Sequence, residues 1–171
     1  IKVSGVKVIK MADMIKVGMA DLNICHAPDA ITTLGLGSCV GVALYDQPKK
    51  LAGLVHVMLP DSTQVRQNQN RAKFADTGID YLIEQMEKEG ALKSRLTAKI
   101  AGGAQMFAFS TNNDMLRVGE RNVEAVKAKL RKLGIHILAE DTGLNFGRTV
   151  EFYPETGDFV IKSVGKPIRT I

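Results

Sequence analysis

A cysteine and a histidine are the side chains of this sequence whose types and spacing could support nucleophilic chemistry. Cys39 follows a glycine-rich bend at Gly35–Ser38, and His56 ends the next apolar segment of the chain. If these two segments pair as neighbouring strands, the thiol and the imidazole can face each other, which is the minimum arrangement for a cysteine nucleophile. Because a free thiol has a pKa of roughly 8.5, the imidazole would be needed to take its proton near neutral pH.

The bend before Cys39 offers further groups that such chemistry requires. Gly35 and Gly37 have no Cβ, so the backbone can turn there and leave room for a substrate beside the sulfur. The backbone N–H groups of Ser38 and Cys39 could stabilise an oxyanion. We therefore expect Gly37 and Ser38 to border the substrate.

A third group is expected to orient the imidazole, and two adjacent threonines are candidates. Thr32 and Thr33 lie in the segment before the bend. Side chains alternate between the two faces of a strand, so only one of them can face His56. The residues alone leave this choice open.

A second glycine pair, Gly102-Gly103, precedes Met106 and Phe107. The glycines either form a simple turn or let the backbone of a substrate or partner come close. Phe107, together with Met106, would either present an apolar contact to a partner or pack in the core.

Composition and motifs exclude several other classes of protein. The net charge of +5 is spread among interleaved acids without an arginine cluster or aromatic platform, so nucleic-acid binding is not expected. No apolar run approaches the roughly 18–20 residues of a membrane span. Cys25-His26 lacks the further ligands of a zinc site, and Gly35-Leu-Gly37 lacks the third glycine of a dinucleotide motif. We expect neither metal nor cofactor.

The pattern of apolar residues predicts a mixed α/β fold in one domain at residues 15–171, after an extension at residues 1–14. Helical periodicity predicts helices over residues 75–90 and 123–133. Strands are predicted at residues 15–23, 31–36, 40–45, 51–59, 97–101, 135–139, 149–153 and 159–164. Two cysteines without a disulfide framework indicate a cytoplasmic protein.

Three ordered blocks of the sequence carry a family pattern: Thr33–Cys39, His56–Ser62 and Ala101–Phe107. Later blocks fit it as well: Arg121-Asn122, Glu140–Gly143 and Gly147-Arg148. Together they resemble the CheD family, the chemoreceptor glutamine deamidases of bacterial chemotaxis, from about Ile15 to the C-terminus. One departure is Leu144, where the resemblance leads us to expect a second glycine. It concerns the shape of that loop, not the catalytic residues.

The resemblance implies a β-sandwich core with helices packed outside, and a role for each candidate residue. Cys39 would be the nucleophile, His56 the general base and Thr33 the residue that orients the histidine. The expected activity is hydrolysis of chemoreceptor glutamine side chains to glutamate through a thioester, without a cofactor. Methyl-ester hydrolysis at glutamate would pass through the same acyl-enzyme.

The expected partners are the cytoplasmic helices of chemoreceptors and the CheC phosphatase, which would compete for the substrate surface. Two alternatives stay open: a cysteine protease with the same residues, or a non-catalytic regulator that binds CheC. Asp141, Thr142 and Arg148 either bind substrate or only fix loops, and Arg121-Asn122 could serve only to cap a helix.

Overall fold

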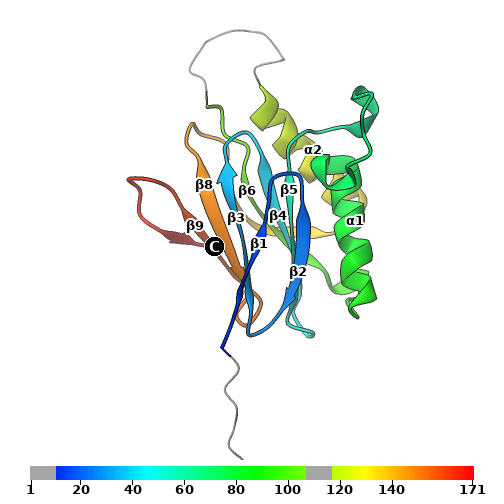
Figure 1. Cartoon of the computed structure of the whole chain (residues 1–171), viewed down its shortest axis with the longest axis vertical. Coiled ribbons are helices and arrows are strands. Elements are labelled where there is room, and N and C mark those ends of the chain that lie inside the picture. Colours follow the sequence, from blue (N-terminus) through cyan, green and yellow to red (C-terminus); the bar gives the residue numbers. More distant parts are fainter. Residues whose placement is uncertain (1–10, 107–116) are drawn as a thin grey trace, which may run out of the picture.

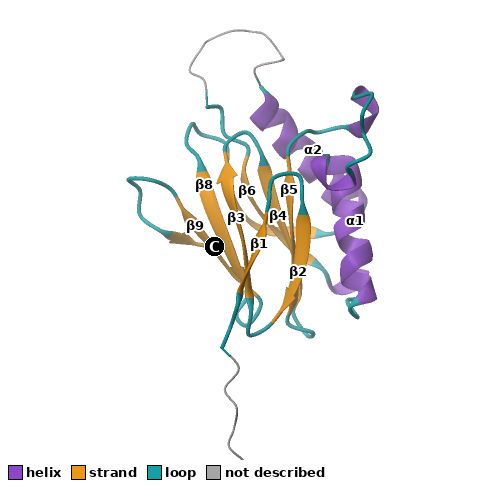
Figure 2. Ribbon diagram, in the orientation of Figure 1, coloured by secondary structure: helices purple, strands orange, loops and turns teal. Residues whose placement is uncertain are grey.

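The computed structural model describes residues 11–106 and 117–171. In these residues two five-stranded β-sheets pack face to face, and two helices cover the outer side of one sheet (Figures 1 and 2). The strands are β1 (Met14–Val17), β2 (Leu22–His26), β3 (Ala30–Leu36), β4 (Val40–Asp46), β5 (Leu51–Val57), β6 (Thr97–Gly102), β7 (His136–Thr142), β8 (Arg148–Tyr153), β9 (Asp158–Lys162) and β10 (Arg169–Thr170). The helices are α1 (Ala75–Lys88) and α2 (Val118–Lys132), with 3₁₀ turns at Ser62–Gln64, Arg71–Lys73 and Lys93–Arg95. The expected mixed α/β sandwich is confirmed.

Each sheet contains one parallel pair of strands. Sheet A has the order β1-β3-β8-β9-β10, and sheet B has the order β2-β5-β4-β6-β7. Strands β1 and β3 run parallel, as do β6 and β7, and the other neighbours are antiparallel. Strands β1 and β2 are consecutive in the chain, yet each forms an edge of a different sheet.

The segment at residues 15–23, predicted as a single strand, is divided between these two edges. Met14–Val17 pairs with β3, whereas Leu22–His26 pairs with β5. The turn between them contains Ala20, whose φ of 54° is incompatible with a continuing strand. The prediction of one strand is wrong, because weak alternation of apolar residues cannot reveal where a chain changes sheets.

The alternation of side chains along β4 divides the core into two layers. Val40, Val42 and Leu44 pack with residues of both helices, whereas Ala43 packs in the layer between the two sheets. In β5, a Cβ on Gly53 would lie 2.6 Å from Leu82 Cδ1, so glycine lets α1 approach the strand closely. Sheet B is thus buried on both faces.

The predicted helices are present, with different bounds. The predicted apolar stripe of α1 is buried, and the helix ends before Gly90, whose φ is 99°. Helix α2 starts at Val118, earlier than predicted, and ends before Gly134, whose φ is 71°. Positive φ at a glycine is the usual way for a helix to end.

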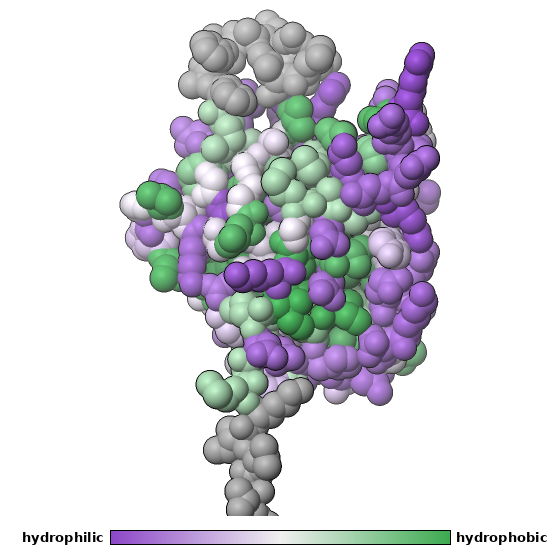
Figure 3. Space-filling model, in the orientation of Figure 1, coloured by the Kyte–Doolittle hydropathy of each residue, from purple (hydrophilic) through white to green (hydrophobic). Residues whose placement is uncertain are grey.

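The surface has distinct hydrophilic and hydrophobic areas. Figure 3 shows hydrophilic side chains over the side of the molecule that carries α1, and a hydrophobic area near β1 and β2. Among the described residues, no helix has the length and apolar character needed to cross a membrane.

Candidate active site

Cys39 immediately precedes β4, and His56 lies in β5, the adjacent strand that the sequence predicted to pair with it. In the antiparallel pair β4–β5, Gly41 is directly opposite His56, and Cys39 lies two residues before Gly41. By alternation Gly41 and His56 share the face of sheet B that is turned toward sheet A, and Cys39, just before β4, packs in the same layer between the sheets. Gly41 has no side chain, so none stands there between His56 and the start of β4, which Cys39 precedes. His56 is fully buried, and Cys39 is 7% exposed.

Thr33 reaches His56 from the opposite sheet. The Thr33 hydroxyl donates to the Val17 carbonyl at 2.8 Å and contacts His56 Nδ1 at 2.7 Å. A hydroxyl has one proton, so Nδ1 must carry its own proton and donate it to Thr33. His56 Nε2 is then unprotonated, and it has no hydrogen-bond partner among the described residues. It is the ring atom that can accept a proton from a thiol.

Thr32 faces away from the imidazole, as alternation requires. Its hydroxyl donates to the carbonyl of Val150 in β8 at 2.7 Å. The geometry thus places Thr33, and not Thr32, beside His56, a choice that the residues alone left open.

Burial favours the neutral forms of both candidate catalytic groups. It lowers the pKa of His56 below 6.5 and raises the pKa of the Cys39 thiol, although the backbone N–H of Cys39 opposes the second shift. A free imidazole and a thiol therefore coexist near neutral pH, and proton transfer would accompany attack on a substrate. In Cys25, burial and the Asp29 carboxylate raise the thiol pKa to about 12.

We call the segment before β4 the Cys39 loop (Gly37–Cys39). Hydrogen bonds to its backbone carbonyl groups hold it in place. The Ala104 N–H donates to the Gly37 carbonyl at 2.8 Å. The Gly103 N–H donates to the Cys39 carbonyl, also at 2.8 Å. Both donors lie just after β6, so this segment positions the backbone around the thiol.

Asn122 of α2 provides a third donor to the same region. Its Nδ2 donates to the Ser38 carbonyl at 2.9 Å and to the Met58 carbonyl at 3.0 Å. One amide thus ties the residue before Cys39 to the residue that follows β5, the strand that carries His56. Asn122 is fully buried in the second turn of the helix, so it does not cap α2.

Gly102 and Gly103 are explained by close packing within the protein. A Cβ on Gly102 would lie 2.2 Å from the Cys39 carbonyl oxygen. A Cβ on Gly103 would lie 2.2 Å from Val123 Cγ2 in α2. Both glycines have positive φ, so they support the Cys39 loop, and contact of either with a substrate stays a prediction.

Met106 is the exposed apolar residue beside the Cys39 loop. It is 47% exposed, and a Cβ on Gly37 would lie 3.3 Å from its Cγ. Its predicted partner, Phe107, lies outside the described residues.

Asp141 and Arg148 form a buried pair that fixes the loop between β7 and β8. Arg148 Nε donates to Asp141 at 2.8 Å, and its Nη1 donates to the Gly143 carbonyl at 3.0 Å. Arg169 also pairs with Asp141. Leu144 has a φ of 60°, so it adopts the conformation that the expected glycine would favour. The pair supports the loop, and direct contact of either residue with a substrate stays a prediction.

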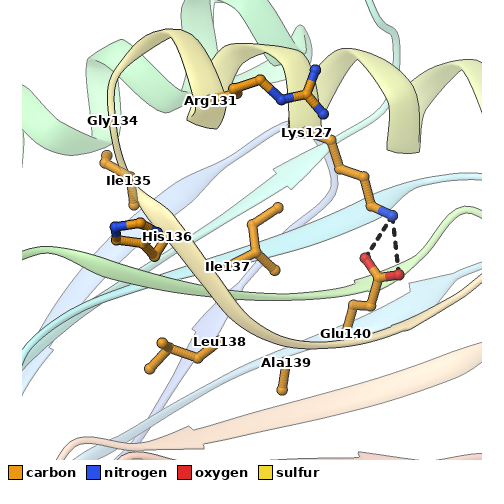
Figure 4. A pocket seen from close by; sticks show the side chains of 9 residues that line it. All are labelled: Lys127, Arg131, Gly134, Ile135, His136, Ile137, Leu138, Ala139 and Glu140. Atoms are coloured by element: carbon orange, nitrogen blue, oxygen red, sulfur yellow. Dashed lines mark hydrogen bonds and ion pairs between the residues drawn. The ribbon is translucent and has the colours of Figure 1, made fainter.

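A cavity of about 610 Å³ lies elsewhere, between α2 and β7 (Figure 4). The ion pair between Lys127 and Glu140, at 2.8 Å, borders it. Its lining includes a histidine, His136, but no cysteine, serine or threonine. It therefore lacks the thiol and histidine pair that the sequence predicts for the catalytic site.

Comparison with known proteins bears on this site. A sequence model of the family described as "CheD chemotactic sensory transduction" matches residues 58–163. A "Probable chemoreceptor glutamine deamidase CheD" of Lachnoclostridium phytofermentans is 68% identical over 161 residues, which are 94% of this chain and 100% of that protein. The "Chemoreceptor glutamine deamidase CheD" of Halalkalibacterium halodurans is 59% identical over 90% of this chain and 96% of its own length.

This chain belongs to the CheD family. The family model begins after His56, so the near full-length alignments with CheD relatives are what extend the similarity over most of the chain. The earlier resemblance to CheD is confirmed.

Asn122 is the residue of this CheD site that sequence reasoning missed. It was predicted only to cap a helix, within the pair Arg121-Asn122. The available clue is its place in α2: Asn122, Val126 and Leu130 follow one another at intervals of four and are all buried. A polar residue in a buried stripe needs hydrogen-bond partners, and here they are backbone carbonyls of the site.

Proposed function

We propose that this chain hydrolyses the carboxamide of glutamine side chains on the cytoplasmic helices of chemoreceptors, giving glutamate and ammonia in the cytoplasm. The observation that carries the proposal is the Thr33–His56 contact, which leaves Nε2 as a base on the sandwich face that also holds Cys39. The names of the two relatives support the substrate class. Neither a metal nor another cofactor is required for this reaction.

Acylation begins when His56 Nε2 takes the thiol proton of Cys39 and the sulfur attacks the carboxamide carbon. The new C–S bond places negative charge on the former carbonyl oxygen, where the N–H groups of Ser38 and Cys39 can donate to it. Collapse of this intermediate breaks the C–N bond, and His56 gives its proton to the leaving nitrogen. Ammonia departs, and a thioester remains on Cys39.

Deacylation uses the same two residues, with water as the nucleophile and the Cys39 sulfur as the leaving group. A water molecule gives a proton to His56 Nε2 and attacks the thioester carbon. The C–S bond then breaks, the sulfur recovers the proton, and glutamate is released. Overall one water is consumed and one ammonia is formed for each glutamine.

A protein substrate has to present its glutamine side chain at the Cys39 loop. A glutamine on a receptor helix extends far enough from its backbone to enter a narrow opening without unfolding. Met106 beside Gly37 offers an apolar contact to such a helix. We propose that CheC, as a second partner, competes for the same surface.

Incubation with an intact receptor cytoplasmic domain tests the proposal. We expect release of ammonia and conversion of specific glutamines to glutamate, measured by mass spectrometry, while the receptor chain stays whole. Cleavage of the receptor chain would instead identify a cysteine protease. A preparation that binds CheC but releases no ammonia would favour the non-catalytic regulator.

Replacement of Thr33 by alanine is expected to lower kcat by about 10–100-fold and to change KM by less than about threefold. The physical reason is that the imidazole loses the acceptor that holds its proton on Nδ1. Steady-state ammonia release measures both constants. Thr32→Ala is the matched control, because Thr32 donates to Val150 and should leave kcat unchanged. An unaltered kcat in Thr33→Ala would remove this residue from the site.

Iodoacetamide is expected to modify Cys39 well before Cys25 between about pH 7 and pH 9. The pKa of Cys25 is raised to about 12, so almost none of it is thiolate in this range. Burial also raises the pKa of the Cys39 thiol, but its own backbone N–H opposes this shift, and the proposed base, the unpaired Nε2 of His56, can accept the proton. Mass spectrometry of the labelled peptides gives the order, and a receptor fragment should protect Cys39. Equal labelling of the two thiols would contradict an activated Cys39.

A further inference from the structure

We propose that Asn122 is a positioning residue that aims the backbone N–H of Cys39 at the oxyanion of the reaction. Within the Cys39 loop, the carbonyls on either side of the Ser38–Cys39 peptide are held by backbone N–H groups. The Ser38 carbonyl is instead held by a side chain, the amide of Asn122. The inference rests on the proposed function, because it concerns the donor that this reaction needs.

The planarity of the peptide bond connects Asn122 to Cys39. In a trans peptide the C=O and N–H bonds point in opposite directions. The cis peptide of the described residues is Ala27-Pro28, so the Ser38–Cys39 peptide is trans. Because Asn122 draws the Ser38 carbonyl toward α2, the Cys39 N–H points away from α2. The N–H also lies close enough to its own sulfur to favour the thiolate.

The second bond of Asn122 fixes the other side of the site. Its Nδ2 also donates to the Met58 carbonyl, just beyond the strand that carries His56. The two bonds from one nitrogen hold the Cys39 loop at a set distance from this strand. Asn122 can therefore control both the orientation of the Cys39 N–H and the distance between the Cys39 loop and the strand that carries His56.

An asparagine at this buried position of α2 is energetically unfavourable, which indicates that Asn122 has a role beyond helix packing. Asn122 Oδ1 is buried and has no hydrogen-bond partner among the described residues. Val126 and Leu130, one and two turns later, fill the same stripe with apolar side chains. An apolar residue would avoid a buried unpaired carbonyl, which is unfavourable, but it could not hold the Ser38 carbonyl.

The test measures kcat, KM and the pH dependence of Cys39 alkylation in Asn122→Ala. We expect kcat to fall at least about tenfold with KM changed less than about threefold, since an oxyanion donor acts in the transition state. The pH midpoint of alkylation by iodoacetamide should rise by about half a unit or more, as the thiolate loses its N–H. The limiting alkylation rate at high pH should stay within about threefold, because alkylation forms no oxyanion.

Two further variants separate positioning from general damage. Val126→Ala removes packing from the same stripe of α2 and should leave kcat and the alkylation midpoint unchanged. Asn122→Leu keeps roughly the size of the side chain and fills the buried site but has no donor, so its loss of kcat should be within about threefold of that in Asn122→Ala. Circular dichroism and thermal unfolding establish that each variant is folded.

The outcomes distinguish this inference from the proposed function. If the wild-type protein deamidates receptors and both Asn122 variants keep its kcat, the inference fails alone. Equal losses in Val126→Ala and Asn122→Ala would overturn it as well, because they would show a general effect of α2. If the wild-type protein releases no ammonia, the deamidase proposal fails, and an unshifted alkylation midpoint would still overturn the role of Asn122.

Discussion

Replacement of Cys39 by alanine is expected to lower glutamine deamidation by at least about 10⁴-fold, to the level of the uncatalysed reaction in this assay. Without the sulfur no thioester can form, and His56 has no thiol proton to accept. Binding of a receptor fragment or of CheC should change less than about threefold, because alanine is smaller than cysteine and the position is nearly buried. Ammonia release and a direct binding assay measure the two effects.

Cys25→Ala is the matched control for this experiment. Cys25 is buried within the sandwich, its Sγ lies 3.9 Å from the Asp29 carbonyl oxygen, and no hydrogen bond among the described residues joins it to His56. Its replacement should leave kcat unchanged. Full activity of Cys39→Ala, or loss of activity in Cys25→Ala, would show that the nucleophile has been assigned to the wrong residue.

Replacement of Arg148 by alanine is expected to reduce the free energy of unfolding by about 3 kcal/mol. The guanidinium is buried, pairs with Asp141, donates to the Gly143 carbonyl and lies over the ring of Phe146 at 4.5 Å. Among the described residues, its removal leaves the buried Asp141 carboxylate with the more exposed Arg169 as its ion-pair partner. Urea denaturation measures the difference from the wild-type protein.

The control is Arg169→Ala, which removes the other partner of the same carboxylate. Arg169 has a largely exposed side chain, and exposed ion pairs contribute about 0–1 kcal/mol. We therefore expect a loss of less than about 1 kcal/mol. If Arg148→Ala cost no more than Arg169→Ala, the buried pair would not be what stabilises the loop between β7 and β8.

Local patterns in the sequence were enough to predict the two long helices and most strands, and to select Cys39 and His56 as the candidate catalytic residues. Apolar residues at helical spacing mark α1, and the segments on each side of the glycine bend are β3 and β4. The pairing of β4, which begins just after Cys39, with β5, which carries His56, follows from a short connection, which favours antiparallel strands. These features depend on residues close together in the chain, so the sequence reveals them.

The tertiary structure decided what depends on contacts between distant segments. The choice between Thr32 and Thr33 depends on which face of β3 meets sheet B, and the resemblance to CheD had already favoured Thr33. The split of residues 15–23 into β1 and β2 depends on the pairing of each half with a different sheet.

Asn122 is the clearest example of a feature that only the tertiary structure reveals. Its amide donates to the backbone carbonyls of Ser38 and Met58, which are far away in sequence. The sequence determined which groups could do the chemistry. Only the packing of α2 and the two sheets determined which backbone groups surround these side chains. Every residue type has a backbone carbonyl, so the sequence does not reveal which carbonyls accept a hydrogen bond from Asn122.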